Sequence, residues 1–398
     1  MSYPLVTLQP GKEKNVLFRH PWIFSGALVK RPEGVEHGDI VRVADSAGAV
    51  IGTGTYSAKS SIAVRIFDFG DNGAVIDQAW FAGKFTEADA RRKLLGFAPD
   101  SQVDGYRVVF GEADGVPGLV IDRYRGVFVI QISTAGVDRL RSEVVAAIKE
   151  VFSPAAIIER SDLPVRKEEA LKDETGVLFG EAPDRAEFSE YGLRFSADVA
   201  AGQKTGFFLD QKSLRSSIRK FADGRETLNL FSYTGAAGIA AAKGGAKSVL
   251  NVDSSADALA GCLRHAELNG IEPHVFMTEE ADAFQFLSAK TEPAFDMVLM
   301  DPPALIKAQR DEEEGKKAYH FLNRAALRLV RDGGVFVTSS CSHFLNEEDF
   351  AFILRRASVQ AGAHLDLLEV VRQAPDHPGS VYFPESAYLK SFVFQVRR

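Results

Sequence analysis

The C-terminal half of the chain alternates short apolar runs with segments whose apolar residues recur at helical spacing. The runs beyond residue 225 are residues 227–231, 248–252, 275–277, 295–300 and 334–338. Strands that alternate with helices in this way predict a largely parallel sheet with helices on both faces. Ligands of such sheets bind at the carboxyl ends of the strands, so we expect a functional site there.

The first 190 residues follow a different pattern. Up to residue 67, short runs of period two alternate with turn residues, which predicts a small β-barrel, and the turn-rich segment 68–73 predicts a linker. A helix is expected over residues 78–95, and from residue 106 the period returns to two, which predicts a mixed α+β region. We therefore expect three domains, over residues 1–73, 74–190 and 191–398.

Composition and charge narrow the class of protein. The 398 residues are 45% hydrophobic and 25% charged, which excludes a disordered chain. With 47 Lys and Arg against 54 Asp and Glu, the net charge is −7, so an RNA-binding face has to come from one segment. No uncharged apolar run approaches the ~18 residues of a membrane span, and the first residues lack a signal-peptide pattern. We expect a cytoplasmic protein without a membrane partner, and the sequence leaves open whether it is a monomer or a homodimer.

Small and acidic residues follow four of the predicted strands. In the turn after the first strand, Tyr233 stands where a dinucleotide fingerprint needs glycine, which disfavours NAD and FAD. Asp253 ends the second strand about 20 residues further on, the distance at which a carboxylate binds ribose hydroxyls. Asp282 follows the third strand, where it would meet an adenine amino group, and Asp301-Pro302-Pro303 follows the fourth. Each aspartate alone is more often a turn or helix cap, but the four features in this order resemble class I methyltransferases that use S-adenosylmethionine.

The chain has two cysteines in different surroundings. Cys262 lies in a predicted helix among small and apolar residues, which indicates a core residue. Cys341 follows the fifth strand among small hydroxyl residues, where its thiol would face the same edge of the sheet as Asp301. A thiolate there is a candidate nucleophile. Two cysteines so far apart do not predict a metal site or a disulfide framework.

The pairing of Cys341 with Asp301 favours methylation of a ring carbon. Carbon 5 of a pyrimidine is hardly nucleophilic until a thiolate adds to carbon 6, and a carboxyl group at ring nitrogen 3 would stabilise the charge that develops. Methylation at nitrogen or oxygen needs no cysteine, and the base must leave its stack to reach such a site. The residues alone do not separate cytosine from uracil. They also leave open a guanine-N7 methyltransferase and a catalytically inactive RNA-binding protein.

Nearly the whole chain resembles the RlmI-type 23S ribosomal RNA cytosine-5 methyltransferases. The most specific matches are Gln203-Lys204-Thr205-Gly206 and Ser340-Cys341-Ser342, and the resemblance also rests on residues 19–26, 202–212, 229–235, 301–303 and 383–390. It implies an α/β fold in which a Rossmann-like class I methyltransferase domain follows an N-terminal PUA β-barrel and a central α+β domain. It also implies methyl transfer from S-adenosylmethionine to carbon 5 of a cytosine in 23S ribosomal RNA, either free or partly assembled.

The resemblance implies roles for individual residues. Cys341 would attack the base with Asp301 beside it. The cofactor would be held by Lys204, Asp210, Phe231, Ser232, Gly235, Asp253, Ser254, Asp282, Ala283 and Asp301. Lys212 stands where arginine is usual in the family, a change that keeps the charge and loses bidentate geometry.

Proton removal and RNA binding are two further parts of this expectation. Ala304 stands where two-cysteine RNA cytosine methyltransferases carry a second cysteine, so another base must take the carbon 5 proton. Glu385 is the candidate by similarity of position to single-cysteine uracil methyltransferases, and His343 and His377 are weaker candidates. The PUA resemblance implies an RNA-binding face, for which we expect Lys12, Arg19, His20 and Trp22. For Phe24 we favour a place in the barrel core instead.

Overall fold

The computed structural model describes residues 3–398, which form two compact units. Unit 1 contains the described residues up to Ser189, together with Ser196–Leu209 and Pro375–Ser386. Unit 2 contains Glu190–Phe195, Asp210–Ala374 and Ala387–Arg398. The C-terminal part of the chain thus contributes a segment to unit 1, and the division into three consecutive domains stays a prediction.

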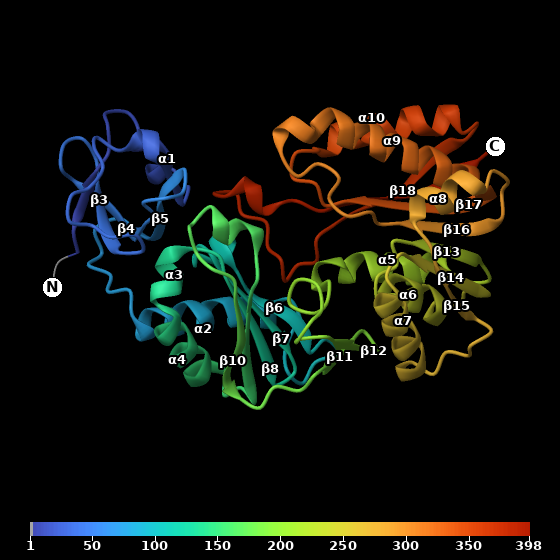
Figure 1. The fold of residues 1–398 in the computed structure, drawn as a ribbon, viewed down its shortest axis with the longest axis horizontal. Helices are drawn as coiled ribbons and strands as arrows, with labels where there is room; N and C mark the ends of the chain where they lie inside the picture. Colours follow the sequence, from blue (N-terminus) through green and yellow to red (C-terminus); the bar gives the residue numbers. More distant parts are fainter. Residues whose placement is uncertain (1–2) are drawn as a thin grey trace. The chain divides into compact units, whose positions relative to one another are not determined.

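The N-terminal part of unit 1 is a five-stranded sheet with the order β1-β3-β4-β5-β2 (Figure 1). β1 and β3 are parallel, and the other pairs are antiparallel. Its core contains Val41, Val43, Val64 and Ile66, which alternate along β3 and β5 as the period of two predicts. The elements are β1 Leu5–Thr7, α1 Lys14–Leu17, β2 Trp22–Phe24, β3 Ile40–Ala44, β4 Val50–Tyr56 and β5 Ile62–Phe69.

The second sheet of unit 1 has the order β10-β9-β8-β7-β6 and packs against helices. β8 and β9 are parallel, and α3 and α4 form the crossover between them. Phe81 and Phe85 of α2 share one apolar core with Ile121 and Ile130 of the sheet. The elements are α2 Gln78–Leu94, β6 Gly105–Phe110, β7 Leu119–Tyr124, β8 Val127–Ile132, α3 Ala135–Arg139, α4 Arg141–Phe152, β9 Ala156–Ser161 and β10 Glu174–Gly180.

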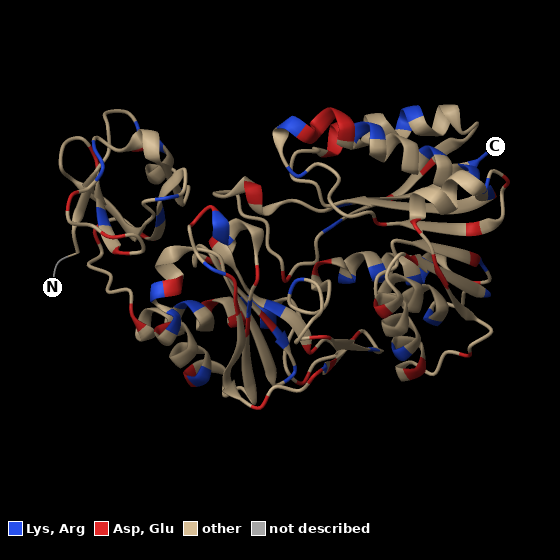
Figure 2. Cartoon of the chain, viewed as in Figure 1, with Lys and Arg blue, Asp and Glu red and all other residues tan. Residues whose placement is uncertain are grey.

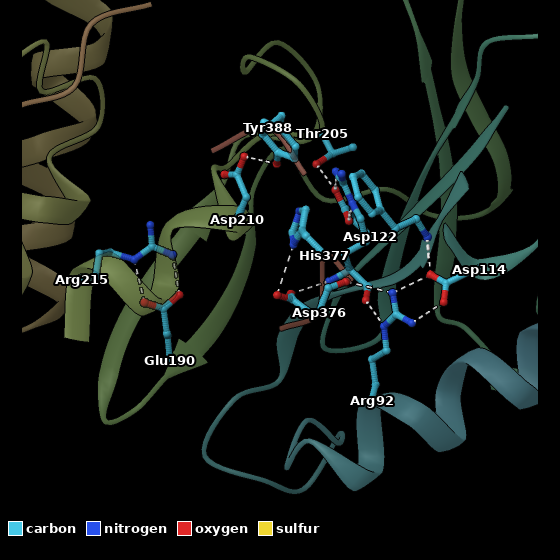
Figure 3. Close-up of polar contacts among 12 residues, drawn as sticks. Arg92, Asp114, Asp122, Glu190, Thr205, Asp210, Arg215, Asp376, His377 and Tyr388 are labelled. Carbon is cyan, nitrogen blue, oxygen red and sulfur yellow. Dashed lines mark hydrogen bonds and ion pairs between the residues drawn. The ribbon is translucent and has the colours of Figure 1, made fainter. Parts of the chain in front are cut away.

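Buried ion pairs accompany this core. The guanidinium of Arg92 is buried at the end of α2 and donates to the two carboxylate oxygens of Asp114 at 2.7 and 2.6 Å (Figure 3). Burial alone would raise the pKa of Asp114, but the hydrogen bonds and charge of Arg92 lower it below its usual value. Arg107 and Asp122 form a second buried pair at 2.8 Å. Because each charge is paired and hydrogen-bonded, the interior can accommodate it.

Gly105 in β6 leaves no room for a side chain. A Cβ atom there would lie 2.1 Å from the ring of Phe188, which is itself buried. We expect Gly105→Ala to lower the free energy of unfolding by about 1–3 kcal/mol, because the ring must move. The matched control is Gly83→Ala in α2, where a Cβ atom would meet open space and should stabilise the helix by about 0.5–1 kcal/mol. Thermal unfolding of both variants measures the difference, and equal melting temperatures would contradict the prediction.

Unit 2 contains a seven-stranded sheet with the order β15-β14-β13-β16-β17-β19-β18. The strands from β15 to β17 are parallel, and β19 is antiparallel to both of its neighbours. Leu230 pairs with Val252 and Met300, and Met300 pairs with Thr338, so the carboxyl ends of four strands meet at one edge. The strands are β13 Glu226–Leu230, β14 Ser248–Asp253, β15 Phe276–Glu280, β16 Phe295–Met300, β17 Val330–Ser340, β18 His364–Arg372 and β19 Lys390–Arg397.

Helices cover both faces of this sheet, as the alternating pattern predicts. α5, α6 and α7 lie along one face, and α8, α9 and α10 lie along the other (Figure 1). On the second side, Tyr319 and Leu322 of α9 pack with Val298 and Phe336 of the sheet. The helices are α5 Lys212–Phe221, α6 Ala236–Lys243, α7 Ala256–Leu268, α8 Ala283–Ala289, α9 Glu312–Arg328 and α10 Glu347–Gln360. The hairpin β11 Ala186–Glu190 and β12 Leu193–Ala197 completes the strands.

Charged residues are spread over both units. Figure 2 shows basic and acidic residues interspersed along most elements. An acidic group at the start of α9 is Glu312, Glu313 and Glu314, which lie in the first turn, where the helix dipole favours negative charge. Within residues 3–398, no helix is long and apolar enough to span a membrane.

Candidate active site

The loop after β13 has an unusual backbone. Phe231, Tyr233 and Gly235 have φ angles of 55°, 47° and 76°. Two side-chain-bearing residues in the left-handed region are a source of strain that the surrounding packing must hold. At Gly235 a Cβ atom would lie 2.8 Å from the Cys262 sulfur, so only glycine fits without movement. Ser232 lies buried between these residues.

Asp253 fixes this loop from the end of β14. Its carboxylate accepts hydrogen bonds from the backbone N–H of Tyr233 at 2.8 Å and of Ser255 at 3.0 Å. The aspartate predicted to bind ribose therefore also acts as a local cap. Ser254 beside it is exposed. The two predicted segments, after β13 and after β14, are thus joined at one edge of the sheet.

Asp282 and Ala283 begin α8 beside an aromatic cluster. Asp282 is exposed, and its Oδ1 accepts from the backbone N–H of Gln285 at 3.0 Å, so it caps the helix. Phe284 stacks on Phe321 with ring centroids 5.9 Å apart, and the ring of Phe231 meets Phe284 edge-on at 6.4 Å. An aromatic cluster next to strand-end carboxylates suits a purine nucleoside, since the rings can pack on the base and the carboxylates can accept from hydroxyl and amino groups. These residues therefore fit the adenosine part of S-adenosylmethionine.

Asp301 follows β16 and is held by a side chain that the sequence analysis did not single out. The amide Nε2 of Gln211 donates to Oδ2 of Asp301 at 2.5 Å. Asp301 is half-buried, and it lies directly after Met300, whose strand pairs with β17. An orienting hydrogen bond of this kind fixes the direction of the carboxyl group.

The two cysteines differ in exposure as predicted. Cys262 is completely buried, its thiol donates to the backbone oxygen of Tyr233 at 3.1 Å, and burial raises its pKa to about 12. Cys341 is partly exposed at the carboxyl end of β17. Cys262 is thus an inert core residue, and Cys341 is the cysteine that a ligand could reach.

Tyr319 and two serines hold the backbone on either side of Cys341. The hydroxyl of Tyr319 accepts from Ser340 at 2.9 Å and lies 3.0 Å from the hydroxyl of Ser342. Ser342 in turn accepts from the backbone N–H of Ile306 at 3.2 Å. The turn that carries Cys341 is therefore tied to the segment that follows Asp301-Pro302-Pro303.

Lys390 is buried next to the same turn. It begins β19 directly opposite Ser340 of β17, and its side chain points to the backbone of the cysteine turn. Its ammonium donates to the carbonyl oxygen of Ser342 at 2.8 Å and to that of Leu345. Burial lowers the pKa of Lys390 to about 8, an effect that the nearby Cys341 and Glu347 partly oppose.

The remaining predicted cofactor and base residues lie in both units. Asp210 and Lys212 are buried in unit 2, where Asp210 accepts from the hydroxyl of Tyr388 at 2.6 Å (Figure 3). Lys204 lies in unit 1 with its ammonium 4.2 Å from the ring centre of Phe208. Glu385, His377 and their segment also belong to unit 1. The structure therefore brings Phe231, Ser232, Gly235, Asp253, Asp210, Asp301 and Cys341 into one unit, and places Lys204 and Glu385 in the other.

The two histidines considered as weaker bases have different surroundings. His377 is buried against the carboxylate of Asp376 at 3.2 Å and the ring of Phe110. His343 is exposed after the cysteine turn. Among the described residues, no group of three or more His, Cys, Asp or Glu side chains is arranged to hold a metal ion.

Three of the predicted RNA-binding residues, Arg19, His20 and Trp22, lie at or just before the start of β2 in unit 1. The ring of Trp22 meets the ring of Phe383 at 4.8 Å, and its indole N–H donates to Glu112 at 2.8 Å. His20 lies 3.5 Å from the carboxylate of Glu385, and Arg19 lies over the ring of Tyr382. Lys12 is exposed. The expectation that Phe24 belongs to the barrel core is wrong, because its side chain is 48% exposed at the edge strand.

Sequence reasoning missed Gln211, Tyr319 and Lys390. Gln211 and Lys390 lie inside segments that carry the family resemblance. The local signal for Lys390 is that a lysine begins a strand that is otherwise largely apolar. Tyr319 lies in the middle of α9, where an aromatic residue at helical spacing indicates nothing beyond the core.

Comparison with known proteins gives two family matches. Residues 6–69 match a PUA-like domain, and residues 154–395 match the S-adenosylmethionine-dependent methyltransferase family. The chain is 35% identical over 397 residues to the ribosomal RNA large subunit methyltransferase I of Klebsiella pneumoniae (strain 342). This alignment covers 99% of this chain and 98% of the relative. The protein of the same name from Salmonella choleraesuis (strain SC-B67) is 35% identical over 398 residues, and the alignment covers 99% of this chain and 98% of that relative.

Solved structures agree on the fold. A protein from Streptococcus mutans assigned as a SAM-dependent methyltransferase superimposes with a TM-score of 0.83 at 22% identity, over 98% of this chain and 100% of that one. The structure of SMU.776, solved in complex with SAH, superimposes with a TM-score of 0.84 at 23% identity. The superposition covers 99% of this chain and 100% of that one. The predicted fold class, a Rossmann-like methyltransferase domain with an N-terminal PUA-like domain, is confirmed, as is S-adenosylmethionine as the cofactor.

Proposed function

Because the chain belongs to the S-adenosylmethionine-dependent methyltransferase family, together with ribosomal RNA large subunit methyltransferase I, we propose that it methylates carbon 5 of a cytosine in large-subunit ribosomal RNA. The single observation that carries the choice of carbon is the partly exposed Cys341 at the carboxyl end of β17, one strand from Asp301. A methyltransferase that acts on nitrogen or oxygen has no use for a reachable thiol at this place. The relatives' name supports ribosomal RNA as the substrate.

In the proposed reaction Cys341 acts first. Its thiolate adds to carbon 6 of the cytosine, so that a carbon–sulfur bond forms and electron density moves to carbon 5 and nitrogen 3. Asp301, oriented by Gln211, would share a proton with nitrogen 3 and so stabilise the negative charge that develops there. Carbon 5 would then form a bond to the electrophilic methyl group that S-adenosylmethionine supplies when it is bound, the methyl–sulfur bond would break, and S-adenosylhomocysteine would be the leaving group. Afterwards a base removes the proton from carbon 5, the ring double bond re-forms, and the thiolate leaves.

Four groups of residues would hold the cofactor. We propose that Asp253 binds the ribose hydroxyls and that Asp282 and Ala283 bind the adenine next to the aromatic cluster. Phe231, Ser232 and Gly235 would lie under the methionine part, with Asp210 and Lys204 at its polar end. The pairing of Asp253 with two backbone N–H groups supports its role, because a carboxylate held in this way presents a fixed oxygen to the ligand.

Glu385 is proposed as the base that takes the carbon 5 proton. Its carboxylate is half-buried and lies 3.5 Å from His20, a predicted RNA-binding residue, which supports a place close to bound RNA. We expect Glu385→Gln to complete thiolate addition and methyl transfer but to release product at least about 10²-fold more slowly, the size of a lost general base. Denaturing gel electrophoresis would then show RNA covalently attached to the protein. Normal turnover by this variant, or an adduct that persists in Glu385→Gln/Cys341→Ala, would contradict the proposal.

The function is tested with isotopically labelled cofactor. The protein is incubated with labelled S-adenosylmethionine and ribosomal RNA from a strain that lacks the gene, offered either as naked 23S RNA or as large-subunit particles. Mass spectrometry of the nucleosides should show labelled 5-methylcytidine. A product of 5-methyluridine or 7-methylguanosine would instead identify uracil or guanine as the target base. No labelled nucleoside from either RNA would favour an inactive RNA-binding protein.

A further inference from the structure

A buried cation that is held by backbone carbonyl groups lies beside the proposed nucleophile. The side chain of Lys390 is 7% exposed, and its ammonium donates to the carbonyl oxygens of Ser342 and Leu345. Both of these partners are backbone carbonyl groups, so the ammonium is held by carbonyl dipoles. Burying a charge in this way is costly, and such groups are retained where they serve a purpose.

The surroundings of Lys390 contain three other titratable groups. Cys341 lies in the turn whose carbonyl groups accept from the ammonium, and Glu347 lies at the start of α10. Cys341 and Glu347 both favour the charged form of Lys390. Tyr319 of α9 faces the same turn, and burial raises its pKa, so it stays a neutral phenol near pH 7. Cys341 is thus the group next to Lys390 that changes charge at nucleophilic attack.

We propose that Lys390 is a positioning residue for methyl transfer: it fixes the backbone of the turn at residues 342–345 and its positive charge stabilises the thiolate of Cys341. This inference rests on the proposed function, in which Cys341 is the nucleophile. No proton passes between the two side chains. The thiol loses its proton to solvent, Lys390 keeps its own, and the thiolate that leaves at the end of the cycle returns to the same electrostatic environment.

The geometry explains why a cationic side chain is needed at this position. The antiparallel pairing of Ser340 with Lys390 fixes where the lysine starts, one residue before the cysteine. The two carbonyl groups then fix where the ammonium ends, because each accepts one of its N–H donors. A neutral side chain would leave both carbonyl groups without their donor and Cys341 without its cation.

The rate of alkylation of Cys341 tests the proposal without RNA or cofactor. The full chain is treated with iodoacetamide between pH 5.5 and 10, and the modified peptides of Cys341 and Cys262 are quantified by mass spectrometry. For the wild type, the midpoint of the Cys341 profile should lie below the ordinary thiol value of about 8.5. Cys262 should stay unmodified over this range and reports that the protein is folded, because its pKa is raised to about 12 by burial.

Variants separate charge from structure. Lys390→Met should move the Cys341 midpoint up by about one pH unit, which makes alkylation at pH 7 about tenfold slower, with nearly equal rates at pH 10, where the thiol is ionised in both proteins. Lys390→Arg should keep the low midpoint, and Lys317→Met on the exposed surface of α9 should change nothing. Equal midpoints for the wild type and Lys390→Met, or a wild-type midpoint above 8.5, would overturn the proposal. The second criterion needs no variant and holds even if Lys390→Met does not fold.

The proposed function and this inference can fail separately. If Cys341→Ala still produces 5-methylcytidine, the thiol is not the nucleophile and the proposed function is wrong, whatever the alkylation profile. If Cys341→Ala is inactive while the Cys341 alkylation midpoint is the same in the wild type and in Lys390→Met, the proposed function stands and the electrostatic role of Lys390 is wrong.

Discussion

Replacing Cys341 with alanine is expected to reduce methyl transfer by more than about 10³-fold, because the covalent path to an activated carbon 5 is lost. Cofactor binding should be unchanged, since Cys341 follows β17 whereas the proposed cofactor loop follows β13 and is capped from the end of β14. Single-turnover methylation of ribosomal RNA and calorimetric titration with S-adenosylmethionine measure the two effects. An inactive variant that still binds the cofactor identifies a loss of chemistry and excludes a loss of fold.

The matched control is Cys262→Ala. This residue is completely buried against the loop after β13, so its truncation removes packing and should lower the melting temperature and weaken cofactor binding, while methylation of RNA at saturating S-adenosylmethionine continues near the wild-type rate. If Cys262→Ala were inactive and Cys341→Ala active, Cys262 would be the nucleophile and the assignment of Cys341 would be wrong. Substantial 5-methylcytidine from Cys341→Ala would remove the covalent mechanism altogether.

The architecture of unit 2 was accessible from sequence because its signals are local. Parallel strands that are covered on both faces appear as continuous apolar runs, and the loops after them carry the functional residues. Asp253, Asp301 and Cys341 could therefore be placed at one edge of the sheet from their positions after three runs. The two last strands were harder to predict, since β18 is largely exposed and pairs with β19 at the edge of the sheet.

The supporting contacts were not accessible, because they join residues far apart in the chain. Gln211 and Asp301 are 90 positions apart, and Lys390 and Ser342 are 48 positions apart. Register between β17 and β19 decides the second contact, and a shift by one residue would turn the lysine to the other face. The place of Phe24 was predicted wrongly for a related reason. Alternation on an edge strand shows which residues share a face, but it does not show which face is covered.

Asp301→Asn addresses the other half of the proposed chemistry. The side chain keeps its size and loses its negative charge and its ability to share a proton with ring nitrogen 3 of the base. The amide of Gln211, which donates to Oδ2, can still meet the carbonyl oxygen of an asparagine, so the backbone after β16 should stay in place. We expect methyl transfer to fall by about 10²–10⁴-fold, the range of a lost general acid or charge stabiliser.

Three measurements on Asp301→Asn separate its role from that of Cys341. Methylation should be slow at every pH, the RNA adduct should not accumulate even when combined with Glu385→Gln, and alkylation of Cys341 by iodoacetamide should persist because the thiol itself is intact. Asp296→Asn, at the other end of β16, is the control: it removes a carboxylate that pairs with Arg331 and should affect stability more than activity. Rapid formation of the covalent RNA adduct by Asp301→Asn would show that thiolate addition proceeds without this carboxyl group. Asp301 would then be assigned to cofactor binding alone.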